Sequence, residues 1–309
     1  MPIDGDRLGE RRTSRGMAFA RVTALVAIAA TVSVVALITG CVTSPSELSA
    51  YDTTTSPARL STFEGEHVVF RGPGDEVLDL TYILPASTGS VTAADGAADA
   101  ADSNAPVPLV YLIHGLGASG RIWYRDPFTH GGELAAMLLD RGYAIAFFDL
   151  PYHGAHQISA PDRNTAIFSD NHYDEFVREV TREMLLYQSY LESAAGFDVG
   201  PEYVVGYSLG AALALVVADD LGLDAIVAAV PPLLSRVNGD STPWSDRSEP
   251  ATPVLMLGAI QDESVGDRSY YQEYLADIPS VDTSLIWFES GHSLPADWLD
   301  SAAEWLAAH

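Results

Sequence analysis

Uninterrupted apolar runs alternate with stretches of helical periodicity along most of this chain. The runs are PLVYLIHG at 108–115, YAIAFFDL at 143–150, AIVAAV at 225–230 and PVLMLGAI at 253–260. Strands that read as continuous apolar runs are typically buried on both faces, as in parallel sheets. The intervening stretches, such as residues 172–195, place apolar side chains at helical spacing. The alternation therefore predicts a mostly parallel sheet with helices on both faces.

Further segments complete the expected fold. The strands HVVF at 67–70 and VLDLTYIL at 77–84 are expected to form a hairpin around the glycine- and proline-rich turn at 72–74. Two more strands are expected at 203–208 and 284–290, and helices at 131–141, 209–220, 267–276 and 296–308. No second linker interrupts the alternation, so we expect residues 62–309 to form one domain. Residues 86–107, rich in Ala, Asp and Ser, are expected to be a mobile surface insertion.

The pentapeptide GYSLG at 206–210 lies between an expected strand and an expected helix. A serine in this position sits on a sharp strand-to-helix turn, and the residues two away on either side must be small because the turn packs backbone against them. The helix N-terminus behind the turn favours a developing negative charge. Ser208 is therefore the candidate nucleophile.

A serine hydroxyl needs a base that takes its proton, and that base needs an acid that orients it. His292 follows the last expected strand and Asp262 follows the strand before it, so both belong at the same sheet edge as Ser208. Glu263 and Asp267 are close rivals for the acid, and a surface histidine is the alternative for His292. The order of the candidates is serine, aspartate, histidine.

The tetrahedral intermediate of acyl transfer also needs hydrogen-bond donors for its oxyanion. The backbone amide of Leu209, directly after the serine, is one candidate. The second is expected from HGLG at 114–117, where Leu116 is preferred and Gly117 is the rival. His114 is expected to be a structural hydrogen-bonding residue beneath this loop.

These landmarks resemble the α/β-hydrolase family. The resemblance rests on HGLG at 114–117, GYSLG at 206–210, the aspartate and histidine after the last two strands, and DLPYHG at 149–154. It covers roughly residues 62–309 and implies an eight-stranded, mostly parallel sheet whose first pair is antiparallel. It also implies that Asp149 and His153 shape the loop near the site. Family resemblance does not identify the substrate.

Only about 20 residues, 231–252, separate the sixth of the implied strands from the acid-bearing strand, which is too few for a helical cap domain. A second insertion at 155–171 is expected to roof the pocket. A small lid favours a modest acyl ester over a lipase substrate.

The leading function is therefore a carboxylic-ester hydrolase that works through an acyl-enzyme. The alternatives are a peptidase or amidase, a thioesterase or a dienelactone-type hydrolase, and, from another class, an inactive surface-binding lipoprotein. An aspartate nucleophile, as in epoxide hydrolases and dehalogenases, is disfavoured by the serine at 208.

The first 41 residues have the features of a targeting signal. Five arginines precede the uncharged run at 22–38, which ends in LITGC, and Met17 is a second possible start. This ending resembles a bacterial lipobox, which implies a signal peptide at 1–40 and a lipidated Cys41 that anchors the protein outside the cytoplasmic membrane. An uncleaved transmembrane anchor is the alternative. Residues 41–61, rich in Ser, Thr and Pro, are expected to be a flexible tether.

Composition excludes several other classes. The net charge of −26 makes the chain a poor partner for nucleic acid, and Cys41 is the one cysteine, so no intramolecular disulfide forms. The eight histidines include no HExxH pair, and His153 and His156 lie in a context unsuited to a helical metal site. We expect no metal and no cofactor. The sequence says nothing about the oligomeric state.

Overall fold

The computed structural model describes residues 48–60, 63–86, 105–169, 172–232, 252–263, 269–277 and 282–309. The expected signal peptide at 1–40, Cys41 and most of the insertion at 86–107 lie outside the described residues. So does most of the short segment at 231–252. Among the described residues, none of the helices combines the length and the apolar character that a bilayer-spanning helix needs.

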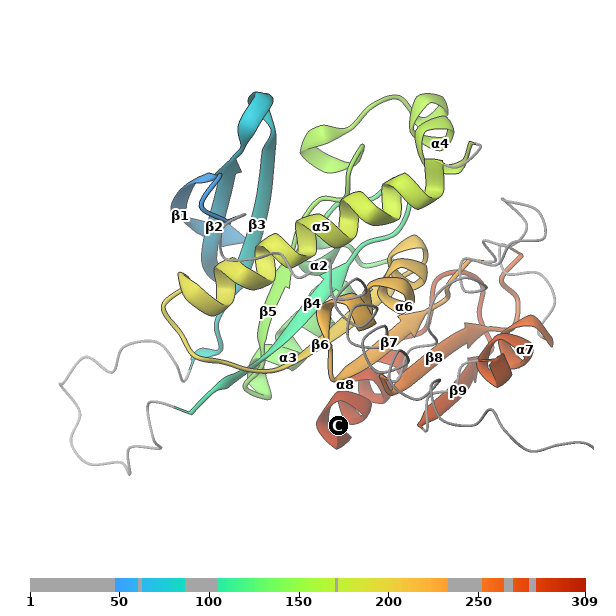
Figure 1. The fold of residues 1–309 in the computed structure, drawn as a ribbon. Helices are drawn as coiled ribbons and strands as arrows, with labels where there is room; N and C mark the ends of the chain where they lie inside the picture. The colour runs from blue at the N-terminus through green and yellow to red at the C-terminus, as the bar shows by residue number, and fades with distance from the viewer. Residues whose placement is uncertain are drawn as a thin grey trace, which may run out of the picture. The chain divides into compact units, whose positions relative to one another are not determined.

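In the part of the chain that the structure describes, nine strands form one sheet in the order β1-β2-β3-β5-β4-β6-β7-β8-β9 (Figure 1). The strands are β1 (Asp52–Leu60), β2 (Phe63–Arg71), β3 (Val77–Ile83), β4 (Val107–Ile113), β5 (Ala144–Phe147), β6 (Val199–Tyr207), β7 (Ala225–Ala229), β8 (Val254–Ala259) and β9 (Thr283–Phe288). Strands β1, β2 and β3 pair antiparallel, and β3 joins β5 antiparallel. From β5 to β9 all neighbours are parallel.

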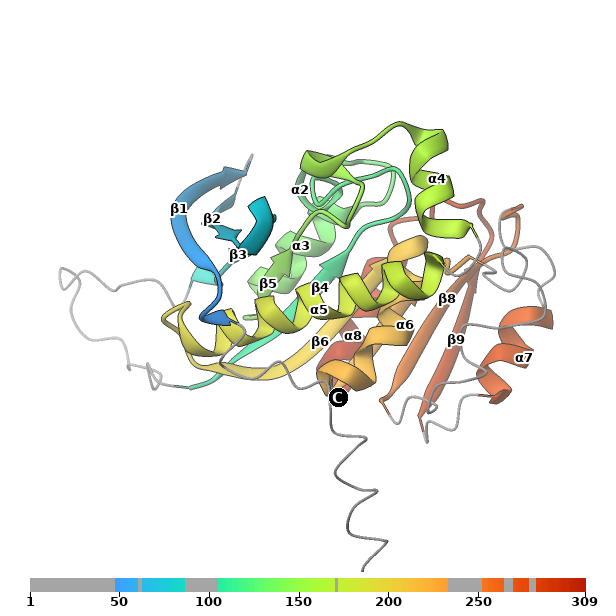
Figure 2. The same cartoon turned by 45° about the horizontal axis from the view of Figure 1, so that its top comes forward.

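Helices cover both faces of the sheet (Figure 2). The helices are α2 (Ile122–Arg125), α3 (Gly131–Asp140), α4 (Ala160–Phe168), α5 (His172–Ser193), α6 (Leu209–Leu221), α7 (Ser269–Asp277) and α8 (Trp298–Ala308), with short 3₁₀ turns η2 (Pro73–Asp75) and η4 (Gly154–His156). Helices α5 and α6 pack on one face, and α3 and α8 pack on the other. The predicted three-layer architecture is confirmed.

The central strand β4 shows why the strands read as continuous apolar runs. Leu109 and Tyr111 belong to the core beneath α5 and α6, whereas Val110 and Leu112 belong to the core beneath α3 and α8. All four side chains are fully buried. Successive side chains of a strand point to opposite faces, so a strand with a core on each side needs apolar residues at every position.

Strand β1 corrects two expectations. Residues 52–60 fall inside the segment expected to be a tether, but they pair with β2 from Asp52↔Arg71 to Leu60↔Phe63 and raise the strand count from eight to nine. Most β1 side chains are exposed, so the strand lacks the apolar alternation by which a half-buried strand is recognised. Its β-branched threonines favour extended backbone, while the Ser, Thr and Pro composition resembles that of a linker.

Candidate active site

Ser208 lies between the end of β6 and the start of α6. Its backbone has φ 56° and ψ −119°, a conformation that L-residues with a side chain rarely adopt. The glycines on either side explain why the chain can turn so sharply. A Cβ on Gly206 would lie 2.1 Å from the Gly210 carbonyl oxygen, and a Cβ on Gly210 would lie 2.1 Å from the Ile113 oxygen. Both positions therefore require glycine.

Asp262 and His292 meet at the carboxyl ends of the neighbouring parallel strands β8 and β9. The Asp262 Oδ2 lies 2.6 Å from the His292 Nδ1. The carboxylate side chain is 1% exposed and the imidazole is 31% exposed. A buried carboxylate on Nδ1 holds the proton there, which leaves Nε2 as the free acceptor. Of the rival acids, Glu263 is exposed and Asp267 lies outside the described residues.

The residue before the serine holds the backbone of the histidine loop. The hydroxyl of Tyr207 donates a hydrogen bond to the His292 carbonyl oxygen at 2.7 Å and accepts one from the Leu294 amide at 3.1 Å. Burial raises the pKa of Tyr207 to about 12, so the hydroxyl keeps its proton. The Tyr207 and His292 rings meet edge to face, with centroids 6.0 Å apart. Among the described residues, no hydrogen bond joins the Ser208 hydroxyl to His292.

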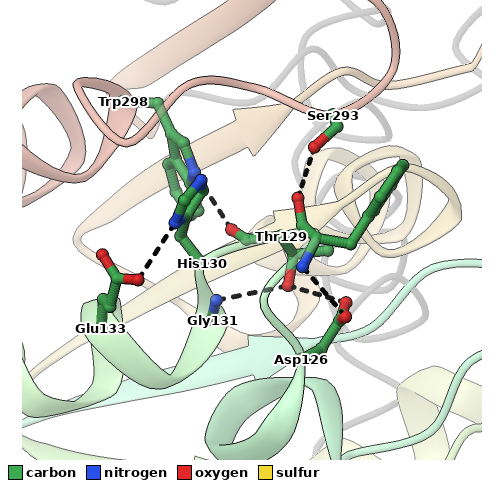
Figure 3. Close-up of polar contacts among 8 residues, drawn as sticks. Asp126, Thr129, His130, Gly131, Glu133, Ser293 and Trp298 are labelled. Carbon is green, nitrogen blue, oxygen red and sulfur yellow. Dashed lines mark hydrogen bonds and ion pairs between the residues drawn. The ribbon is translucent and has the colours of Figure 1, made fainter.

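The loop before α3 also contacts the segment that follows His292 (Figure 3). The Ser293 hydroxyl donates to the Phe128 carbonyl oxygen at 2.5 Å, and the Trp298 indole donates to the Thr129 carbonyl oxygen at 3.1 Å. Asp126 holds this loop through the Phe128 amide at 3.0 Å and the Thr129 hydroxyl at 3.3 Å. The residues after β9 are thus fixed by β6 and by the loop that precedes α3.

The loop after β4 lies beside the serine. A Cβ on Gly115 would lie 3.1 Å from the Ser208 Cβ and 3.7 Å from its Oγ, so the glycine lets this backbone approach the hydroxyl. Leu116, the preferred oxyanion donor, follows in the same loop and is 39% exposed. Leu209, the other candidate donor, is the first residue of α6. The structure therefore places both candidate donors in segments that adjoin Ser208.

His114 holds this loop from below, as expected. Its Nδ1 donates to the Gly115 carbonyl oxygen at 2.8 Å, and its Nε2 accepts from the Leu150 amide at 3.0 Å. The ring is fully buried, and this burial lowers the pKa of His114 to about 4. The neutral imidazole is therefore a structural link between the loops after β4 and β5.

In the DLPYHG segment at 149–154, Asp149 and His153 make hydrogen bonds to nearby backbone groups. Asp149 accepts hydrogen bonds from the Gly120 and Ala155 amides, each at 2.8 Å. The His153 Nδ1 donates to the Pro151 carbonyl oxygen at 2.8 Å, and the ring is fully buried. In the described part of the chain no group of His, Cys, Asp and Glu side chains could hold a metal ion.

Sequence reasoning missed two residues near the site, Tyr207 and Arg163. Tyr207 occupies a position of the pentapeptide that no sequence pattern constrains, and its contacts reach His292, 85 residues away. Arg163 lies on α4, within the insertion expected to roof the pocket, and its guanidinium lies against the loop after β4. The one signal that the sequence offers for Arg163 is a positive charge within the insertion expected to roof the pocket.

Comparisons with known proteins agree with this architecture. A model of the alpha/beta hydrolase family matches residues 110–246, a segment that includes Ser208 but neither Asp262 nor His292. No protein of curated function matches the sequence. The fold is similar to that of acetyl xylan esterase 1 from Thermoanaerobacterium, with a TM-score of 0.54 and 15% identity over 84% of this chain and 90% of that one.

Two further solved structures are similar. An esterase from Pyrococcus furiosus has a TM-score of 0.51 and 14% identity over 86% of this chain and 95% of the other. A serine hydrolase without a lid from Xanthomonas campestris has a TM-score of 0.50 and 17% identity over 81% and 97%. The sheet order, the turn at Ser208 and these similarities show that the chain has the α/β-hydrolase fold.

Proposed function

We propose that this protein belongs to the α/β-hydrolase family and hydrolyses carboxylic esters, with Ser208 as nucleophile, His292 as base and Asp262 as the acid that orients it. The observation that carries the proposal is the 2.6 Å contact between Asp262 and His292 at the sheet edge where the strained Ser208 turn lies. The order and roles of these three residues match those of the α/β-hydrolase triad.

The reaction takes two steps. His292 Nε2 accepts the proton of the Ser208 hydroxyl while the serine oxygen attacks the ester carbonyl. The proton then passes from His292 to the departing alcohol. In the second step the same nitrogen takes a proton from water, which attacks the acyl-enzyme. His292 then returns this proton to the Ser208 oxygen as the carboxylic acid leaves. The amides of Leu209 and Leu116 stabilise the oxyanion in both steps, aided by the N-terminus of α6.

Two exposed apolar side chains belong to segments that adjoin the candidate site. Leu116 is 39% exposed and Phe128 is 51% exposed, two of the three large apolar residues that are exposed among the described residues. Leu116 lies in the loop beside Ser208, and the Phe128 carbonyl oxygen accepts from Ser293, next to His292. These two side chains offer apolar contact for the acyl or alcohol part of a substrate.

Two of the similar structures are esterases, which supports ester over amide or thioester hydrolysis. The test is a panel of p-nitrophenyl esters of increasing acyl length, with aminoacyl p-nitroanilides and thioesters beside them, and Ser208→Ala as the control. We expect turnover of short and medium esters at a rate far above that of the variant. Faster turnover of the anilides or thioesters would assign the peptidase or thioesterase alternative. Turnover equal to that of the variant throughout would favour a catalytically inactive binding lipoprotein.

We also propose that lipidated Cys41 anchors the mature protein on the outer side of the cytoplasmic membrane. The support is the LITGC ending of the apolar run. Mass spectrometry of the membrane-bound protein should find Cys41 as a lipidated N-terminus, and Cys41→Ser should remove that modification. A chain that keeps residues 1–40 while bound to the membrane would instead assign the uncleaved anchor.

A further inference from the structure

Arg163 is a buried cation without a counter-ion among the described residues. The residue is 8% exposed, and its Nε has no hydrogen-bond partner in the part of the chain that the structure describes. A guanidinium is always charged, and burying a charge without a partner is costly. Proteins normally pair such a group or use it to bind a ligand.

The guanidinium of Arg163 lies against the loop expected to hold the oxyanion. A Cβ on Gly117 would lie 3.1 Å from the Arg163 Nη2, 3.6 Å from its Cζ and 3.7 Å from its Nη1, so the group covers this glycine. Gly117 follows Gly115 by two residues, and Gly115 adjoins the Ser208 hydroxyl. Two residues span at most about 7 Å, which places the cation on the order of 10 Å from the nucleophile.

Neighbouring groups do not use this charge. Asp149 accepts from the amides of Gly120 and Ala155, and among the described residues no hydrogen bond or ion pair joins its carboxylate to Arg163. His153 is neutral, because burial lowers its pKa and the nearby charge of Arg163 lowers it further. Its Nδ1 donates to the Pro151 carbonyl oxygen, and its buried Nε2 is an acceptor without a partner among the residues that the structure describes. Among the described residues, the buried Arg163 Nε and the buried His153 Nε2 thus both have no hydrogen-bond partner, and the Arg163 guanidinium lies beside Gly117 of the loop after β4.

We propose that Arg163 binds a carboxylate carried by the substrate, so that this protein prefers monoesters of dicarboxylic acids. The planar guanidinium matches a carboxylate in geometry and in single charge. The distance to Ser208 suits an acyl chain of about six carbons, with the ester carbonyl at the serine and the free carboxylate at Arg163. This inference rests on the proposed function, whose substrate class it narrows.

The experiment compares two substrates that differ by one charge, the mono-p-nitrophenyl ester of adipate and its methyl-capped neutral analogue. The measured quantity is the ratio of their kcat/KM values. The wild-type protein should favour the charged ester, and Arg163→Met should lower the ratio about 10- to 100-fold, the usual effect of losing a hydrogen bond to a charged group. Arg178→Met is the matched control, because Arg178 is exposed on α5 and its loss changes the net charge equally.

A wild-type protein without preference for the charged ester, or an Arg163→Met variant with an unchanged ratio, would overturn the proposal. If Arg163→Met does not fold, Arg163→Gln replaces it, and the wild-type preference is measurable without either variant. Calorimetry with adipate and Ser208→Ala separates this proposal from the proposed function. Adipate binding that Arg163→Met abolishes supports the anion site even if no ester is hydrolysed, and no binding at millimolar adipate contradicts it.

Discussion

The Tyr207 hydroxyl donates a hydrogen bond of 2.7 Å to the carbonyl oxygen of His292. Tyr207 directly precedes the candidate nucleophile, so one residue connects the turn at Ser208 to the loop that carries the candidate base. The same hydroxyl accepts from the Leu294 amide at 3.1 Å and so holds the loop on both sides of Ser293. The relative position of serine and histidine thus depends on a side chain with no chemical part in the reaction.

Tyr207→Phe should therefore impair both stability and activity. The variant leaves the buried Leu294 amide without its acceptor, which should lower the free energy of unfolding by about 1–3 kcal/mol. A loosened His292 should also lower kcat about tenfold with little change in KM, because small misplacements of a catalytic group are costly. Urea unfolding and ester kinetics measure the two effects.

Tyr203→Phe is the matched control for that variant. Tyr203 lies on the same strand, is 5% exposed, and its hydroxyl makes no hydrogen bond within the described part of the chain. Its substitution should leave kcat unchanged. Equal kcat for Tyr207→Phe and the wild-type protein would show that Tyr207 does not position His292.

Asp262→Asn should leave the fold intact and lower kcat about 10²- to 10⁴-fold. The carboxamide no longer holds the proton on His292 Nδ1 and no longer stabilises the imidazolium. Glu263→Gln removes the next acid along the chain, which is exposed, and should retain wild-type kinetics. If Glu263→Gln were the inactive variant, the assignment of the acid would be wrong.

His114 should make stability depend on pH. Burial lowers its pKa to about 4 in the folded chain, below the usual histidine pKa of about 6.5, so the unfolded chain binds the extra proton first as the pH falls. The contribution of His114 to the free energy of unfolding is complete above pH 6.5. It declines towards pH 4 by a total of about 3 kcal/mol. His153 acts in the same direction, whereas burial raises the pKa of Glu183 and so acts in the opposite direction.

The measurement that isolates His114 is the difference in unfolding free energy between the wild-type protein and His114→Gln, taken by urea titration at pH 7.5, 5.5 and 4.5. The stability of His114→Gln should fall less steeply with acid than that of the wild-type protein. His172→Gln, at the exposed start of α5, serves as the control. Parallel pH profiles for wild-type and His114→Gln proteins would contradict the predicted linkage.

The sheet and the turn at Ser208 were predictable because their signals are local. Residues 107–113 read as a buried strand since both faces meet a core, and the two glycines around Ser208 are dictated by backbone contacts at 2.1 Å. The pairing of Asp262 with His292 also followed from the sequence, because each comes directly after one of two expected parallel strands. Because the carboxyl ends of parallel strands lie at the same edge of the sheet, the two side chains were expected to meet there.

Other features depend on contacts that no local pattern encodes. Strand β1 has mostly exposed side chains and is stabilised by backbone pairing with β2, so composition alone suggested a tether. The Tyr207 hydroxyl reaches a residue 85 positions away, and Arg163 approaches Gly117 from a helix across the loop. Both relationships arise from how β6, α4 and the connecting loops meet in space.

The central claim is that Ser208 becomes acylated, and trapping the acyl-enzyme tests it most directly. The full chain is mixed with p-nitrophenyl butyrate, quenched in acid within milliseconds to seconds, digested and analysed by mass spectrometry, with Ser208→Ala treated in parallel. We predict a butyryl group on the peptide that contains Ser208, a matching burst of p-nitrophenol, and neither in the variant. A butyryl group on another residue, or an undiminished burst from Ser208→Ala, would contradict the mechanism.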